Sequence, residues 1–239
     1  MKGVSAVVII PTYNERENIP ALMRSLLQHD GVGVLVVDDQ SPDGTGAVAD
    51  AVAREFPDRA EVLHRTSNRG FGRSYVDGIR KALTLPVEFV CQMDADFSHD
   101  PARLPVMLAA AHNADVVIGS RYVKGGGVVN WPRRRLLLSR FANFYVRCIT
   151  RLKARDCTSG FRCWRRETLA ALPLDRFVSD GYSFLVEMLF VAARQGRRVA
   201  EIPITYVERR EGQSKMSRAV IAESALTPWR LIATKDRSL

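Results

Sequence analysis

The sequence predicts an α/β protein with a mostly parallel, Rossmann-like sheet flanked by helices. Short apolar runs such as residues 6–10 and 34–37 alternate with segments whose apolar residues recur at helical spacing. Continuous apolar runs are typical of strands buried on both faces, and strands that alternate with helices form parallel sheets covered on both sides. With 239 residues, of which 46% are hydrophobic, the chain is long enough to bury a sizeable core.

The expected elements follow one another in a regular order. A strand at residues 6–10 precedes a helix with Ile19, Leu22, Met23, Leu26 and Leu27 on one face. Further pairs of strand and helix follow at 34–37 and 46–55, at 61–63 and 72–83, and at 89–91 and 101–111, before a strand at 116–118. Beyond residue 120 we expect helices at 136–152, at 183–195 and after Ser217, with a last strand at 199–205. No linker or internal repeat divides the chain, so a single domain over residues 1–239 is expected.

Polar residues gather where the predicted strands end. These clusters are residues 11–15, 38–39, 94–96 and 119–121. Ligands of open α/β sheets bind beyond the carboxyl ends of the strands, so the clusters are expected to converge on one crevice. Neither G-x-G-x-x-G nor G-x-x-x-x-G-K-S/T occurs, which argues against a dinucleotide oxidoreductase and a P-loop enzyme.

Asp94 and Asp96 follow the apolar run at residues 87–93 and form the most informative cluster. Two carboxylates at positions i and i+2 of an extended backbone point to the same side, roughly 6 to 7 Å apart, so they can share one hard cation. The pair therefore predicts a metal-dependent nucleotide-sugar site. The alternative is that these acidic residues only cap the helix that follows.

Charge and cysteine content narrow the class of protein. The chain carries 35 Lys and Arg against 26 Asp and Glu, a net charge of +9, and its pI is near 9.8, so anionic partners are attracted. The four cysteines include no C-x-x-C pair, which argues against zinc or a disulfide framework and favours reduced thiols in the cytoplasm. We find no export signal and no apolar window of about 18 residues, so any membrane contact is expected to be peripheral.

Several longer motifs can be compared with known families. They are V-I-I-P-T-Y-N-E at 8–15, V-V-D-D-Q-S-P-D-G-T at 36–45, D-A-D-F-S-H-D-P at 94–101, G-S-R-Y-V-K-G-G-G-V at 119–128, N-W-P-R-R-R at 130–135, T-S-G-F-R at 158–162 and R-x-x-G-x-S-K at 209–215. Together they resemble the family 2 glycosyltransferases of GT-A fold, and more narrowly the dolichol-phosphate or polyprenol-phosphate mannose synthases. The resemblance covers nearly the whole chain. It implies a GT-A fold in which residues 1–120 bind the nucleotide sugar and residues 121–239 form a C-terminal acceptor-binding elaboration.

The resemblance also implies roles for individual residues. The nucleotide sugar would be held by Pro11, Tyr13, Glu15, Val37, Asp39, Asp94, Ala95 and Asp96, with Arg209 and Lys215 on a loop that closes over the donor. The metal, Mg²⁺ or Mn²⁺, would be bound by Asp94, Asp96 and Ser98. The acceptor phosphate would be bound by Arg121, Arg135 and Ser139. Asp96, Arg121 and Arg135 are the expected catalytic residues.

The activity implied by the resemblance is transfer of mannose from GDP-mannose to a polyprenyl (dolichyl-type) monophosphate. One alternative keeps the fold but uses a UDP-sugar to make polyprenyl-phosphate glucose or a related product. A second alternative, suggested by the pI, is a basic nucleic-acid-binding module. The chain has no zinc-finger spacing or RNP-like motif, and the acidic crevice would repel a phosphate backbone, so no nucleic-acid partner is expected.

The chemistry of the implied acceptor bears on the mechanism. A hydroxyl acceptor ordinarily needs a general base, whereas the second pKa of a phosphate monoester is about 6, so most of it is dianionic at pH 7. We therefore expect direct, inverting displacement driven by positioning and charge stabilisation. Asp180 and Glu187 occupy the region where hydroxyl-using relatives keep a base, and here they are expected to orient the sugar or cap a helix.

Two predicted helices are candidates for contact with a membrane. The helix at 136–152 carries Leu136, Leu137, Leu138, Phe141, Phe144, Tyr145 and Ile149, flanked by basic residues. Apolar and cationic sides are typical of an interfacial helix, and the alternative is an ordinary helix that faces the core. The segment 219–232, with Trp229, allows the same two interpretations. We expect the protein on the cytoplasmic face of a membrane, where a separate membrane-anchoring subunit is a possible partner.

Overall fold

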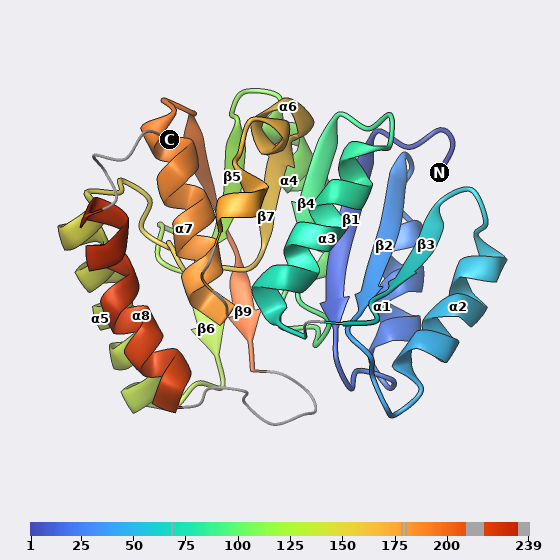
Figure 1. Ribbon diagram of the computed structural model, residues 1–239, viewed down its shortest axis with the longest axis horizontal. Helices are drawn as coiled ribbons and strands as arrows, with labels where there is room; N and C mark the ends of the chain where they lie inside the picture. Colours follow the sequence, from blue (N-terminus) through green and yellow to red (C-terminus); the bar gives the residue numbers. More distant parts are fainter. Residues whose placement is uncertain (68, 178, 180, 209–217, 234–239) are drawn as a thin grey trace.

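The computed structural model describes residues 1–239 except 68, 178, 180, 209–217 and 234–239 (Figure 1). The elements of the first half are β1 (Ala6–Thr12), α1 (Ile19–Leu27), β2 (Val32–Asp38), α2 (Thr45–Glu55), β3 (Ala60–His64), α3 (Phe71–Leu83), β4 (Phe89–Gln92), η1 (Pro101–Arg103), α4 (Leu104–Ala111) and β5 (Val116–Ser120). Those of the second half are β6 (Gly127–Val129), α5 (Arg133–Thr150), β7 (Arg162–Arg165), α6 (Arg166–Ala170), η2 (Leu174–Arg176), α7 (Gly181–Arg194), β8 (Val199–Pro203), β9 (Thr205–Val207) and α8 (Arg218–Ala233).

The centre of the molecule is a seven-stranded sheet in the order β3-β2-β1-β4-β7-β5-β8. The strands β1 to β4 pair in parallel, and so do β5 and β8, whereas β7 is antiparallel to both β4 and β5. The mostly parallel α/β architecture predicted from the sequence is confirmed. The carboxyl ends of β1, β2 and β4 open at one edge of the sheet, the lower edge in Figure 1.

Two separate cores lie on the two faces of the main sheet, and alternating residues of a central strand contribute to one or the other. In β1, Val7 and Ile9 pack with α3 and α7 on one face, and Val8 and Ile10 pack with α1, α2 and α4 on the other. All four side chains are fully buried. Burial on both faces explains why the strands are continuous apolar runs.

Strand β7 was not predicted from the sequence, because its sequence R-C-W-R is not an apolar run. Its Arg162 is nevertheless fully buried. The guanidinium donates to the carbonyl oxygens of Ser159, Leu185 and Cys157 at 2.9, 2.6 and 2.7 Å, which offsets the cost of burying a charge. Burial lowers the pKa of Arg162 to about 10.

The single strand expected at 199–205 is two strands. Strand β8 extends the main sheet beside β5, and β9 pairs in parallel with β6 in a separate two-stranded sheet. The chain crosses between the sheets at Ile204, whose N–H donates to Ser120 O at 3.0 Å. Gly126, directly before β6, approaches the same carbonyl so closely that a Cβ there would lie 2.5 Å from Ser120 O.

Helices α5 and α8 lie side by side at the end of the molecule opposite α2 (Figure 1). Only Asn143, Val146 and Thr150 of α5 are buried. Within the part of the chain that the structure describes, no helix is long and apolar enough to cross a membrane.

Candidate functional site

The backbone is unusual directly beyond three of the strands. Asn14, Gln40 and Phe97 follow β1, β2 and β4, and their φ angles are 60°, 60° and 56°. Residues other than glycine seldom adopt this left-handed conformation, which is most costly for a bulky side chain such as Phe97. Strain of this kind concentrates at binding and catalytic sites, so the backbone alone marks this edge as the candidate site.

Asp39, predicted to bind the nucleoside, is held by groups that the sequence analysis did not assign. Its Oδ2 accepts the N–H of Gly70 at 2.8 Å, and its Oδ1 is paired with Nη1 of Arg65. Arg65 in turn donates from Nε to Asp77 at 2.7 Å. Asp39 and Arg65 are both buried, so the carboxylate has a fixed orientation beside the start of α3.

Of the other residues predicted for the nucleoside, Tyr13 lies beyond the end of β1, whereas Pro11 and Val37 lie within the sheet. The Arg69 guanidinium lies 5.1 Å from the centroid of the Tyr13 ring, at the edge where the strands end. Pro11 pairs with Val37 inside the sheet. The Val37 side chain is fully buried in the core with α3, so the predicted contact of Val37 with the nucleoside would have to come from its backbone.

Glu15 is tied to the loop that begins α2. Its backbone N–H donates to Thr45 Oγ1 at 2.9 Å, and its Oε2 accepts Asn18 Nδ2 at 3.0 Å. Thr45 also donates to Asp43 Oδ1 at 2.6 Å. The loops after β1 and β2 are therefore joined into one wall of the site.

The segment of Asp94 and Asp96 is a turn and does not continue the strand. Strand β4 ends at Gln92, and the chain turns at Ala95 and Asp96, so the extended i, i+2 geometry assumed from the sequence does not hold. Oδ1 of Asp96 accepts the N–H of Ser98 at 3.1 Å and stabilises the turn. The Asp94 side chain is 24% exposed, and Asp96 is buried.

His99 lies beneath this turn and was not predicted as a site residue. The N–H of Asp94 donates to His99 Nδ1 at 3.4 Å, and the imidazole stacks on Phe161 with ring centroids 5.3 Å apart. Burial lowers the pKa of His99 to about 4, and the opposing effect of Asp96 does not overcome it. The side chain is therefore neutral at pH 7.

The oxygen atoms of this turn suit a hard divalent cation. Ser98 Oγ is buried and makes no hydrogen bond to the described residues, and Asp94 and Asp96 supply carboxylates. Among the described residues, no group of three or more His, Cys, Asp or Glu side chains is arranged to hold a metal ion by itself. Such a cation would thus need oxygens from a diphosphate and water, as is usual for Mg²⁺.

Arg121 is oriented by a buried ion pair. Its Nε and Nη2 donate to Asp156 at 2.7 and 2.6 Å, and its backbone N–H donates to the same carboxylate at 3.0 Å. Nη2 also donates to Thr158 Oγ1 at 2.8 Å. Burial would lower the pKa of Arg121, but Asp156 outweighs this effect, so the pKa is raised and the charge is permanent.

Arg135 lies near Arg121 across an aromatic ring. The Arg135 Cζ is 4.2 Å from the centroid of Trp131, and the Arg121 Cζ is 5.6 Å from the same ring. Arg135 also pairs with Glu208. The third residue predicted for the acceptor phosphate, Ser139, accepts a hydrogen bond from Tyr122 Oη at 2.7 Å.

A cavity of about 420 Å³ connects these groups. Asp94, Arg121, Arg135 and Ser139 line its polar part, and it continues between α5, α7 and α8 along apolar side chains that include Phe141. A larger polar cavity of about 730 Å³ lies along α3, and none of the predicted site residues lines it. The smaller cavity therefore has a cationic end, at Arg121 and Arg135, and an apolar part between α5, α7 and α8.

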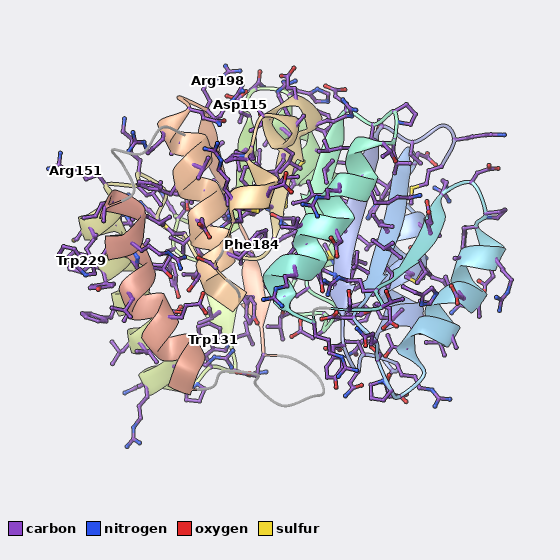
Figure 2. The ribbon with its side chains drawn as sticks, in the orientation of Figure 1. Asp115, Trp131, Arg151, Phe184, Arg198 and Trp229 are labelled. Carbon is purple, nitrogen blue, oxygen red and sulfur yellow. The ribbon has the colours of Figure 1, made fainter. Side chains whose placement is uncertain are left out.

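The outer surface of α5 and α8 is apolar. Leu137, Leu138, Phe141 and Phe144 of α5 are 65, 54, 62 and 60% exposed, and Trp229 of α8 is 54% exposed. Figure 2 shows Trp229 on the side of α8 that faces away from the sheet. One face of α5 packs on the protein through Asn143, Val146 and Thr150, but these four apolar side chains of α5 do not face the core.

The structure thus gathers part of the predicted set. Arg209, Lys215 and Asp180 lie outside the described residues. Glu187 is buried, and its Oε2 accepts the N–H of Ser179 at 3.0 Å. The residues that sequence reasoning missed are Arg65, His99, Trp131, Asp156, Thr158 and Tyr206. The motif T-S-G-F-R with its preceding Asp-Cys was the one signal that could have identified Asp156 and Thr158.

Comparisons with known proteins show the family to which the chain belongs. The model of the family described as Glycosyl transferase family 2 matches residues 7–172. Undecaprenyl-phosphate mannosyltransferase from Micrococcus luteus is 47% identical over 232 residues, which cover 95% of this chain and 94% of that protein. Polyprenol monophosphomannose synthase from Mycolicibacterium smegmatis is 45% identical over 237 residues, which cover 97% of this chain and 89% of that protein.

Solved structures share the fold. Glucosyl-3-phosphoglycerate synthase from Mycobacterium tuberculosis, in complex with Mn²⁺, UDP-glucose and phosphoglyceric acid, superposes with a TM-score of 0.67 at 19% identity over 95% of this chain and 80% of that chain. Fold and relatives together define a glycosyltransferase of the GT-A fold. The chain belongs to glycosyl transferase family 2.

Proposed function

We propose that this glycosyltransferase moves mannose from GDP-mannose to a polyprenyl monophosphate and releases GDP. The proposal is supported by the names of its relatives at 45 to 47% identity. The structural observation that carries it is the cavity in which Arg121, Arg135 and Ser139 meet an apolar channel. An anionic headgroup and an isoprenoid chain are the two parts of a ligand that such a cavity suits.

In this proposal, Asp94, Asp96 and Ser98 bind Mg²⁺ or Mn²⁺ together with the diphosphate of the donor. The bound cation would stabilise the negative charge that gathers on the departing GDP. The loops of Tyr13, Glu15 and Asp39 would hold the nucleoside, and we propose Arg209 and Lys215, which lie outside the described residues, as further ligands of the phosphates. The larger share of the catalysis lies in positioning, because donor and acceptor must meet in line.

The acceptor phosphate is its own nucleophile. Arg121 and Arg135 would hold two of its oxygens and leave the third to attack the anomeric carbon from the face opposite GDP, which inverts the configuration. A phosphate monoester is mostly dianionic at pH 7, since its second pKa is about 6. Glu187, whose carboxylate already accepts a backbone N–H, is not needed as a base.

The isoprenoid chain reaches the cavity from a bilayer. The exposed side chains Leu137, Leu138, Phe141 and Phe144 of α5, with Trp229 of α8, form an apolar surface beside the cavity. Basic residues at the start of α5 would contact acidic headgroups. We propose peripheral binding of this surface to the cytoplasmic face of a membrane, with or without an anchoring subunit.

A donor panel tests the proposed activity. Purified protein and a short-chain polyprenyl phosphate are incubated with GDP-mannose or UDP-glucose, with Mn²⁺, Mg²⁺ or chelator, and the lipid product is measured. We expect product from GDP-mannose only, and only with a divalent cation. Turnover of UDP-glucose alone would favour the UDP-sugar alternative, and cation-independent transfer would contradict the role of Asp94.

A matched pair of variants separates the metal site from general effects of charge. Asp94→Asn is expected to abolish transfer. Asp100→Asn removes an exposed carboxylate nearby that accepts the N–H of Ala102 at 2.9 Å, and it is expected to retain transfer. Equal activity of the two variants would contradict the proposed site.

A further inference from the structure

The three tryptophans of the chain differ in how their indole N–H groups are bonded. Trp164 Nε1 donates to Gln92 Oε1 at 2.8 Å, and Trp229 Nε1 donates to Tyr145 Oη at 2.8 Å. Trp131 Nε1 is buried and makes no hydrogen bond to any described residue. A buried donor without an acceptor is costly, and tryptophan in a protein interior usually has a partner for this group.

Trp131 is placed where an anion is expected. It precedes α5 in the motif N-W-P-R-R-R and lines the cavity together with Arg121, Arg135 and Ser139. In Figure 2 it lies toward the edge at which the strands of the sheet end, far from Trp229 in the view. The unpaired donor therefore belongs to the wall of the candidate acceptor site.

The indole also organises the two arginines. Their Cζ atoms are 5.6 and 4.2 Å from its centroid, and the Tyr206 ring meets it edge-on with centroids 5.2 Å apart. The negative face of an indole attracts guanidinium groups, whereas its N–H edge is positive. One side chain can thus contact both guanidinium groups and add a neutral donor, and one anion could accept hydrogen bonds from all three side chains.

We propose that Trp131 is a further binding residue for the acceptor, whose indole N–H donates to an oxygen of the phosphate monoester while its ring positions Arg121 and Arg135. This inference rests on the proposed function and deepens it. The ligand is a monoester headgroup and not the isoprenoid chain, because a hydrocarbon cannot accept the hydrogen bond that the buried donor lacks.

Indole ¹H–¹⁵N spectra of the whole protein test the inference directly. The resonance of Trp131 is assigned by its loss in Trp131→Phe, and the protein is titrated with a short-chain isoprenyl phosphate and, separately, with the corresponding alcohol. We expect the phosphate to shift the Trp131 resonance and the alcohol to leave it in place. The Trp164 resonance is an internal control, since its N–H already has a partner.

The outcomes separate this inference from the proposed function. Saturable binding of the monoester, detected by calorimetry, with an unmoved Trp131 resonance would overturn the inference and leave the acceptor assignment standing. Failure of the wild-type protein to bind any monoester would overturn both. An equal shift with the alcohol would show that the indole senses the chain, which also overturns the inference.

Steady-state kinetics give a second readout. Trp131→Phe keeps a ring and loses the donor, so we expect the KM for the acceptor to rise by about tenfold, the effect of one hydrogen bond to a charged group. The KM for the donor is expected to stay unchanged, and Trp131→Leu to raise the acceptor KM further. Trp164→Phe is the matched control, expected to lower the Tm without changing either KM. Equal changes in both KM values of Trp131→Phe would indicate a merely structural role and contradict the inference.

Discussion

Asp156→Asn is expected to destabilise the protein strongly, because it removes the counter-charge of a buried guanidinium. Asp156 is fully buried and Arg121 is 8% exposed. The carboxylate accepts three hydrogen bonds from Arg121, at 2.6, 2.7 and 3.0 Å. Breaking a buried pair by changing one partner costs about 3–5 kcal/mol. Domains are stable by only about 5–15 kcal/mol, so the variant should lose a large share of its stability.

Urea unfolding followed by circular dichroism measures this loss. Glu55→Gln is the matched control, since it makes the same change of carboxylate to amide in an exposed pair with Arg24, and we expect no measurable shift of its midpoint. Asp156→Asn should also raise the KM for the acceptor, because Arg121 loses its orientation, and should leave the KM for the donor unchanged. A midpoint equal to that of Glu55→Gln would refute the reasoning.

The remaining predictions concern the metal turn and the membrane surface. Because burial lowers the pKa of His99 from 6.5 to about 4, the folded protein binds fewer protons than the unfolded chain between these values, and stability present above pH 6.5 is lost as the pH falls toward 4. The free energy of unfolding should fall by about 3 kcal/mol over this range. In urea titrations, the free energy of unfolding of His99→Phe should depend less steeply on pH than that of the wild type, and an equal pH dependence would contradict the prediction. Gly160→Ala would bring a Cβ within 3.0 Å of Asp94 Oδ1, so calorimetry should find weaker binding of GDP with Mn²⁺, and full affinity would contradict the close approach. Leu138→Asp should reduce flotation with acidic liposomes, whereas Val106→Asp, an exposed apolar position of α4, should not; equal flotation would count against the membrane surface.

The repeating units of the first half could be predicted because one rule governs them. Each strand there except the edge strand β3 is buried on both faces, and each helix is buried on one face, so apolar periodicity identifies both. The helix predicted from Ile19, Leu22, Met23, Leu26 and Leu27 has these five residues buried, as expected. The rule fails at β7, where buried Arg162 is satisfied by backbone carbonyls that no local pattern reveals.

The pattern of predicted strands placed only those site residues that follow a strand, whereas Arg135 and Ser139 of α5 were predicted from the family resemblance. Asp94 and Arg121 could be placed at one edge, because the carboxyl ends of parallel strands meet there. Trp131 lies in the loop that follows β6, and Asp156 lies in the loop that precedes β7. Their contacts with Arg121 depend on the tertiary structure, so no local sequence pattern reveals them. Alternation along β2 directs the Val37 side chain into the core, so a strand-end position by itself does not bring a side chain into the site.

The nature of the acceptor tests the central claim most directly. Transfer from GDP-mannose with Mn²⁺ is measured for a short-chain polyprenyl phosphate and for the corresponding polyprenol, between pH 5 and 8. Our account predicts transfer to the phosphate alone, with kcat/KM rising as the phosphate loses its second proton near a pKa of about 6. Transfer to the alcohol at a comparable rate would require a general base in the protein and would contradict the account.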